Sequence, residues 1–409
     1  MSVVLLQLGQ CGNQVGQELL ELVSTDGRND PGRPDSYRAI SLERFFRQEA
    51  GTDAVPIARA VLVDMEPKVI SQTLAKAMKS GQWSYGNHSY FCQKQGSGNN
   101  WANGFCIHGP RHEEAVLDLV RREVEQCERF GGFIAMMSLA GGTGSGLGTY
   151  ITQCLRDMYP NSFILNQLTW PYGTGEISFT DINKVIAHQL GSVLQPVCTR
   201  WSISEYGTNP LGDLLESLVT HPEYKLLSLM NIPLMSDKSL QFSTFTWPAL
   251  MKNLRQMLIA NAKMEAGIDW QMKLPPAGHP SVSKPFSDRK LCFNTSLANL
   301  LVLRGKEVFQ ADTDGFKEQA LYTSWMPADS ALSVWRTSTT FSKYEKSASI
   351  VSNSQCLQKS LDRIVTKAWD MFASRAYVHQ YMKHGISEED FLDCFTTVEQ
   401  VIASYSSLG

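Results

Sequence analysis

A glycine-rich stretch, AGGTGSG at residues 140–146, has the composition of a loop that binds phosphate. It follows an apolar run at 133–139 and precedes a segment with helical spacing, which is the setting that such loops need. Glycines let main-chain N–H groups face an anion, and the start of the helix adds its positive end. Thr143 and Ser145 can donate hydroxyl hydrogen bonds. A plain strand-to-helix turn is an equally good interpretation of this loop taken alone.

No lysine accompanies this loop, so the usual source of positive charge is missing. No Gly-Lys-Ser/Thr follows it, which excludes a Walker-type loop. A dinucleotide fingerprint belongs after the first strand of its domain, whereas this loop follows the third apolar run that we interpret as a strand. The first glycine-rich loop is G-x-x-G-x-x-x-G, which also disfavours a dinucleotide-dependent oxidoreductase.

Three further loops follow apolar runs in the first half of the chain. They are GQCGNQ at 9–14, DMEP at 64–67 and GSGNNWA at 96–102. Strand-like and helix-like segments alternate here, which predicts a parallel sheet covered on both faces. The carboxyl ends of parallel strands share one edge, so we expect all four loops to converge there as a ligand site.

Two acids in one of these loops, Asp64 and Glu66, would repel bare phosphate. They fit if Mg²⁺ lies between them and the phosphate, because Mg²⁺ prefers carboxylate and phosphate oxygens. The alternative is that Asp64 only caps a turn before Pro67. A second candidate metal cluster, His108, His112 and the adjacent acids, is better explained as the opening of a helix.

Composition sets the broad class. The chain has 409 residues, which favours two or three domains. Its net charge of −3 gives no indication of a basic surface that would bind nucleic acid. No apolar run is long enough for a membrane span. Nine scattered cysteines without a CxxC pair favour a reduced, intracellular protein.

Taken together, the motifs GQCGNQVGQE, VLVDMEP, GSGNNWA and AGGTGSG resemble the tubulin family in order and spacing, and the resemblance covers nearly the whole chain. It implies an α/β protein with a parallel, Rossmann-like GTPase domain, an α+β intermediate domain and a C-terminal helical hairpin. The expected bounds are 1–195, with a central helix at about 178–195, then 196–354 and 355–409.

The resemblance also implies roles for individual residues. GTP or GDP with Mg²⁺ is the implied ligand, and Asp64 and Glu66 would serve the metal. Phe179 would stack on guanine and Asn183 would read its edge, although Phe179 could equally be a core residue. The other implied nucleotide contacts are Gln10, Cys11, Gln14, Asn99, Ala140, Gly141, Gly142, Thr143, Gly144, Ser145 and Gly146.

In tubulins a neighbouring subunit completes GTP hydrolysis with an acid. The matching position here is Asp213 in NPLGDLLESLV, with Glu216 as the alternative; Asp is shorter than the usual Glu, so weak GTPase activity is all that is expected. Two acids on a surface helix are the plain alternative.

One departure from the family pattern stands out. After Glu176 the sequence runs directly into a helix, where the family has a further helix–strand–helix passage that contacts ribose and guanine. We expect a shortened chain with an exposed sheet edge and weakened nucleotide binding.

The resemblance implies a subunit that assembles longitudinally with other tubulins in the cytoskeleton, in centrioles or centrosomes and in cilia, with the nucleus as a further location. Centriolar or ciliary proteins would be additional partners. The alternative is a tubulin-like scaffold or regulator of ciliary function that does not hydrolyse GTP.

Overall fold

The computed structural model describes residues 1–26, 35–48, 55–170, 178–197, 209–235, 243–262, 267–274 and 293–408. These residues form two compact units. The first contains Met1–Pro196, residues 209–212 and Ser374–Phe391, and the second contains Asp213–Ala373 and Leu392–Gly409. The expected division into three domains stays a prediction.

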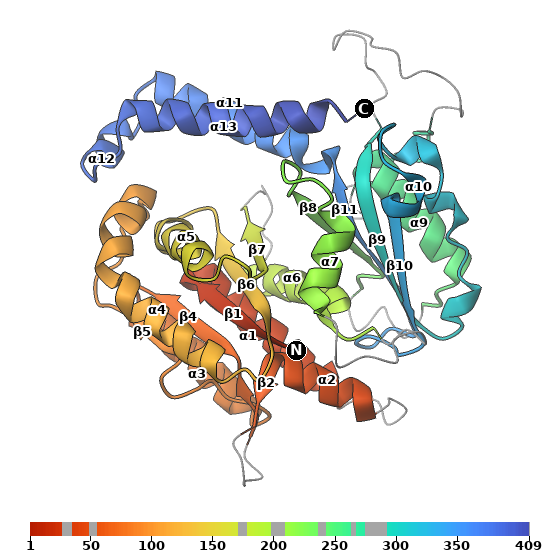
Figure 1. Ribbon diagram of the computed structural model, residues 1–409, viewed down its shortest axis with the longest axis horizontal. Coiled ribbons are helices and arrows are strands. Elements are labelled where there is room, and N and C mark those ends of the chain that lie inside the picture. Colours follow the sequence, from red (N-terminus) through yellow and green to blue (C-terminus); the bar gives the residue numbers. More distant parts are fainter. Residues whose placement is uncertain are drawn as a thin grey trace. The chain divides into compact units, whose positions relative to one another are not determined.

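The first unit is built on a sheet whose described strands all run parallel, in the order β5-β4-β1-β6-β7 (Figure 1). This confirms the α/β fold and the parallel sheet expected from the alternating pattern. The strands are β1 (Ser2–Leu8), β4 (Ala60–Asp64), β5 (Tyr90–Cys92), β6 (Phe130–Ser138) and β7 (Ile164–Thr169), and a separate small ribbon is formed by β2 (Phe46–Arg47) and β3 (Ile57–Ala58).

Helices cover both faces of this sheet because successive residues of each buried strand point to opposite sides. Val3 and Leu5 join a core with α1, α2, α3 and α6, whereas Val4 and Leu6 join a core with α4 and α5. The helices are α1 (Gly9–Asp26), α2 (Asp35–Phe45), α3 (Pro67–Ser80), η1 (Asn103–His108), α4 (Gly109–Glu125), η2 (Thr143–Leu147), α5 (Gly148–Met158) and α6 (Phe179–Leu194).

The second unit holds a mixed sheet in the order β10-β9-β11-β8, in which β11 is antiparallel to both neighbours and β10 is parallel to β9. Its strands are β8 (Leu227–Ile232), β9 (Ser296–Gly305), β10 (Leu332–Thr337) and β11 (Lys346–Ser354). Its helices are the end of α7 (Pro210–Leu218), α9 (Trp247–Ala260), α10 (Ala328–Ala331) and the short turns η5 (Val308–Gln310), η6 (Asp314–Phe316), η7 (Gln319–Leu321) and η8 (Gln355–Leu357).

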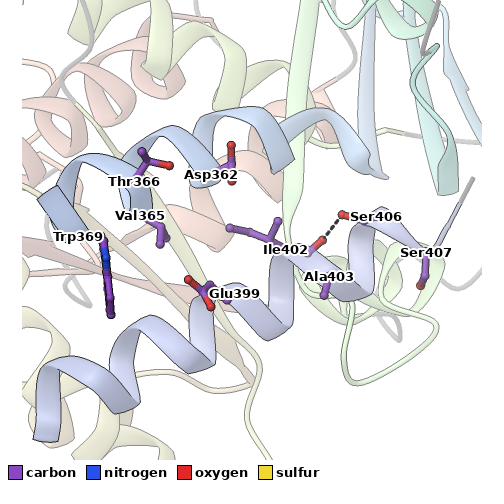
Figure 2. Close-up of a pocket in the computed structure, with 9 residues that line it drawn as sticks. All are labelled: Asp362, Val365, Thr366, Trp369, Glu399, Ile402, Ala403, Ser406 and Ser407. Atoms are coloured by element: carbon purple, nitrogen blue, oxygen red, sulfur yellow. Dashed lines mark hydrogen bonds between the residues drawn. The ribbon is translucent and has the colours of Figure 1, made fainter. Parts of the chain in front are cut away.

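The C-terminal region is helical, as expected, with α11 (Gln358–Ala373), α12 (Val378–Met382) and α13 (Glu388–Ser406). The hydroxyl of Tyr405 on α13 donates to Asn353 of β11 at 2.8 Å, which fixes the end of the helix to the second core. Between α11 and α13 lies a groove of about 670 Å³; Figure 2 shows Trp369 and Val365 on one wall and Ile402 on the other.

The packing of α1 on β6 depends on a glycine. A Cβ atom at Gly12 would lie 2.0 Å from the carbonyl oxygen of Met136, and a backbone atom inside a parallel sheet has no room to move away. The close approach of helix and strand therefore requires that residue 12 has no side chain.

We predict that Gly12→Ala lowers the free energy of unfolding by about 3 kcal/mol or more, because overpacking against main chain forces the helix off the sheet. Gly81→Ala is the matched control. Gly81 has φ +63°, and a Cβ atom there would have no other atom within 4 Å, so only local backbone strain of about 1 kcal/mol is expected. Urea unfolding of both variants measures the difference. Equal losses would contradict the close-packing explanation.

Candidate functional site

The site lies where the connections of the parallel sheet diverge. From β1 the chain crosses to β4 on one side, and from β6 it crosses to β7 on the other, so the carboxyl ends of β1 and β6 border an open crevice. Ligands bind at such a switch point in doubly wound sheets. A cavity of about 910 Å³ occupies this place, and all four polar loops expected to converge contribute to its walls.

Most of the predicted site residues line this cavity. The structure brings together Gln10, Cys11, Gln14, Asp64, Glu66, Asn99, Ala140, Gly141, Gly142, Thr143, Gly144, Phe179 and Asn183. Ser145 and Gly146 are buried beside it and do not line it. The hydroxyl of Ser145 donates to the carbonyl of Gly141 at 2.7 Å, so it braces the loop from within.

The two glycine loops touch main chain to main chain. Gly9 has φ +71°, and a Cβ atom there would lie 2.7 Å from the amide nitrogen of Gly144. The chain can therefore turn from β1 into α1 beside the second loop only with glycine at position 9. The result is a floor of backbone atoms that a phosphate can approach closely.

Positive electrostatic potential comes from helix ends. Among the described elements, α1, α3, η2 and α6 all begin at the cavity, with Gly9, Glu66, Thr143 and Phe179 in its lining. The first turns of helices carry free N–H groups and the positive end of the dipole, which favour anions. The described lining residues include no Lys, Arg or His.

The two acids of the second loop differ in environment. Asp64 is 3% exposed, and its Oδ1 accepts the main-chain N–H of Glu66 at 3.0 Å, so it does cap the turn as the simpler interpretation required. Its Oδ2, however, is buried and has no hydrogen-bond partner among the described residues. Glu66 is exposed at the start of α3.

Burial raises the pKa of Asp64 to about 6, and the neighbouring carboxylate of Glu66 adds to the rise. A cation would reverse this cost by pairing with the unpartnered oxygen. The donor set fits Mg²⁺, which takes one or two carboxylates and completes its shell with phosphate and water. Among the described residues no three His, Cys, Asp or Glu side chains form a metal cluster on their own.

Side chains from α1 and α6 meet at the other end of the cavity. Asn183 donates from Nδ2 to Oε1 of Gln14 at 3.0 Å, which orients both amides. Phe179 lies one helical turn earlier and is 75% exposed, so it is not a core residue within the first unit. An exposed aromatic ring beside two paired amides provides a stacking surface and polar groups for a flat heterocycle.

Several lining residues were not named individually as site residues from the sequence, among them Ser97, Ser138, Thr169 and Trp170, although Ser97 belongs to a loop that was expected there. Ser97 shares a hydrogen bond of 3.2 Å with the hydroxyl of Thr143 and so links two loops. Ser138 and Thr169 are the last residues of β6 and β7, so their position at strand ends was a usable signal.

The far edge of the described sheet is incompletely covered. β7 pairs with β6 on one side, and Leu168 and Trp170 are 47% and 40% exposed. The expected junction after Glu176 lies outside the described residues.

The two candidate catalytic acids lie on α7, where Asp213 is half-buried and Glu216 is exposed. They are expected to act on a nucleotide bound to a neighbouring chain, so their catalytic role stays a prediction.

Comparison with known proteins identifies the family. Residues 2–189 match the Tubulin/FtsZ family, GTPase domain. The whole chain aligns at 54% identity with the full length of the tubulin delta chain of Macaca fascicularis and of that of Homo sapiens. The chain belongs to the tubulin family. It is also 27% identical to a tubulin beta chain of Bombyx mori, over 98% of this chain and 93% of that one. All of the described residues that line the cavity lie within the part of the chain that matches the GTPase domain.

The same alignment bears on the shortened chain. It runs over 455 positions, 46 more than the 409 residues here, and both chains are covered completely. The delta chain therefore carries internal residues that have no counterpart in this chain. That these residues belong after Glu176 stays a prediction.

No described helix is long and apolar enough to cross a membrane.

We predict that Asp64→Asn stabilises the metal-free protein at pH 7.5 by up to about 3 kcal/mol. The carboxyl has a pKa of about 6 when folded and 3.8 ordinarily, so its raised pKa favours the folded state only at low pH, and this contribution is lost as pH rises through about 6. Urea unfolding in EDTA between pH 4 and 7.5 tests this, and the advantage of the Asn variant should vanish near pH 4.

Glu66→Gln is the control, because the exposed carboxylate should change stability by less than about 0.5 kcal/mol. Parallel pH profiles for Asp64→Asn and the wild type would show that the Asp64 carboxylate carries no burial cost.

Proposed function

We propose that this cavity binds GTP or GDP together with Mg²⁺ and that the nucleotide-bound chain assembles with other tubulins. One observation carries the proposal: helix N-termini and an unpartnered buried carboxylate oxygen face the same crevice. The first attract phosphate, and the second favours a cation. A magnesium–triphosphate complex satisfies both demands.

The proposed roles follow the position of each group around the cavity. Phe179 stacks on guanine, and the Asn183–Gln14 amide pair meets its polar edge. The loops at Gly9–Cys11 and 140–144, with Asn99, hold the phosphates. Asp64 and Glu66 hold Mg²⁺, directly or through water, and the metal supplies positive charge to the phosphate oxygens.

Assembly is proposed from the family relationship. Similar proteins are named tubulin delta and tubulin beta chains, and the chain aligns with them over almost its full length. We propose longitudinal contacts with other tubulin chains, a location in the cytoskeleton and centriole or centrosome, and further roles in the cilium and the nucleus. Centriolar or ciliary proteins would be additional partners.

Hydrolysis is proposed to need two chains. The acid that positions the attacking water would come from α7 of the next subunit, where Asp213 is the first candidate and exposed Glu216 the second. Asp213 carries a short side chain, so turnover would be slow.

A second candidate function is a tubulin-like scaffold or regulator that binds nucleotide weakly and does not hydrolyse it. The shorter chain relative to tubulin delta and the exposed face of β7 favour it. Phosphate release by this chain, alone and with alpha/beta-tubulin, separates the two functions.

We predict that Phe179→Ala weakens GTP binding roughly tenfold in titration calorimetry, because it removes the stacking surface for the base. The free energy of unfolding should change by less than about 0.5 kcal/mol, since the ring is 75% exposed. Met78→Ala on α3 is the matched control, because Met78 is equally exposed and does not line the cavity. Equal GTP affinities of the two variants would remove Phe179 from the proposed site.

We predict that Asp213→Ala lowers phosphate release at least tenfold when the chain is mixed with alpha/beta-tubulin and GTP, with little change in GTP affinity. Glu216→Ala is the comparison on the same helix. A loss with Glu216→Ala alone would move the role to that residue. Unchanged release with both variants would favour the scaffold.

A further inference from the structure

A buried amide lies beneath the cavity and makes no part of its lining. Asn13, on the first turns of α1, is 0% exposed. Its Nδ2 donates to the carbonyl oxygen of Gly9 at 2.9 Å and to that of Val63 at 3.3 Å. These two acceptors belong to different loops of the nucleotide site, since Gly9 begins the first glycine loop and Val63 immediately precedes Asp64.

The hydrogen bonds of Asn13 lie at the point where the backbone pairing between β1 and β4 ends. The pairing of β1 with β4 ends at Leu8 and Val63. Beyond it the chain turns into α1 at Gly9 and toward α3 after Asp64. The amide of Asn13 bridges Gly9, the first residue past this pairing, and Val63, the last paired residue of β4, which sets the separation between the glycine loop and the Asp64 carboxylate.

The amide is also incompletely satisfied. Its Oδ1 is buried and has no hydrogen-bond partner among the described residues. An unpaired buried oxygen costs stability, so an apolar residue would serve better if residue 13 only filled space. The two donated hydrogen bonds are the function that an apolar side chain could not supply.

We propose that Asn13 is a positioning residue for magnesium-dependent nucleotide binding: by holding Val63 against Gly9, it keeps Asp64 within reach of a metal on the phosphates. The proposal rests on the proposed function, because it concerns the same site. Asn13 itself does not line the cavity, whose lining residues on the same helix are Gly9, Gln10, Cys11 and Gln14.

The test compares GTP affinity with Mg²⁺ and with EDTA, in the full chain, by titration calorimetry. Wild type should bind GTP more tightly with Mg²⁺. Asn13→Ala should reduce that enhancement roughly fivefold or more, whereas the dissociation constant in EDTA should change by less than about twofold. Asn13→Ser retains one donor and should give an intermediate enhancement; it also serves if the alanine variant does not fold.

The matched control is Asn353→Ala in the second unit. Asn353 is likewise fully buried and donates to two main-chain carbonyls, those of Leu218 and Tyr224, both at 2.9 Å. Its loss should lower the melting temperature to a similar extent as Asn13→Ala, and should leave the Mg²⁺ enhancement at the wild-type value.

The outcomes separate the two proposals. If wild type gives no heat with GTP, the proposed function fails and this inference fails with it. If wild type shows the Mg²⁺ enhancement and Asn13→Ala and Asn13→Ser keep it, only the positioning role is overturned. An equal loss of affinity with and without Mg²⁺ would also overturn it, since the residue would then shape the glycine loop and not the metal side.

Discussion

The proposed nucleotide site depends on how closely main chain can approach main chain at the ends of β1 and β6. Gly9 lies against Gly144, and Gly12 lies against the carbonyl of Met136. Any side chain at these positions would push α1 away from β6 and from the second glycine loop. Because α1 also carries Gln14, which pairs with Asn183 of α6, the base end of the cavity inherits the same constraint. The same close packing therefore fixes the cavity floor, the glycine-rich loops and the proposed base pocket.

The cavity contains unpaired polar groups whose electrostatic cost a bound ligand would reduce. Helix N-termini present free N–H groups, and the described lining contains no cationic side chain. Asp64 is held beneath the surface with one oxygen unpartnered, at a pKa of about 6. An ionised Asp64 without a cation therefore costs stability relative to a neutral side chain, and the proposed magnesium–nucleotide complex would offset that cost on binding. The groups that destabilise the unliganded fold are those that would make the ligand bind.

Much of this arrangement could be predicted from the sequence because local pattern determines it. Apolar runs followed by glycine-rich loops gave the parallel sheet, and strand ends placed Asp64 and Asn99 at one edge. The strands of the second unit were harder to predict individually; LSVWRT of β10, for example, has only partial apolar alternation. Ser97 and Trp170 could not be assigned to the cavity from local pattern, since tertiary packing decides which loop residues face inward. The same is true of Ser145, whose hydroxyl faces its own loop.

The wall of the cavity formed by β7 has a kinetic consequence. Thr169 ends β7, Trp170 follows it, and both line the cavity. In the described sheet β7 is paired on one flank only, and Leu168 is 47% exposed. Edge strands open locally at lower free energy than central ones. We therefore expect that local opening of β7 gives a ligand in the proposed nucleotide site a route for exchange with solvent.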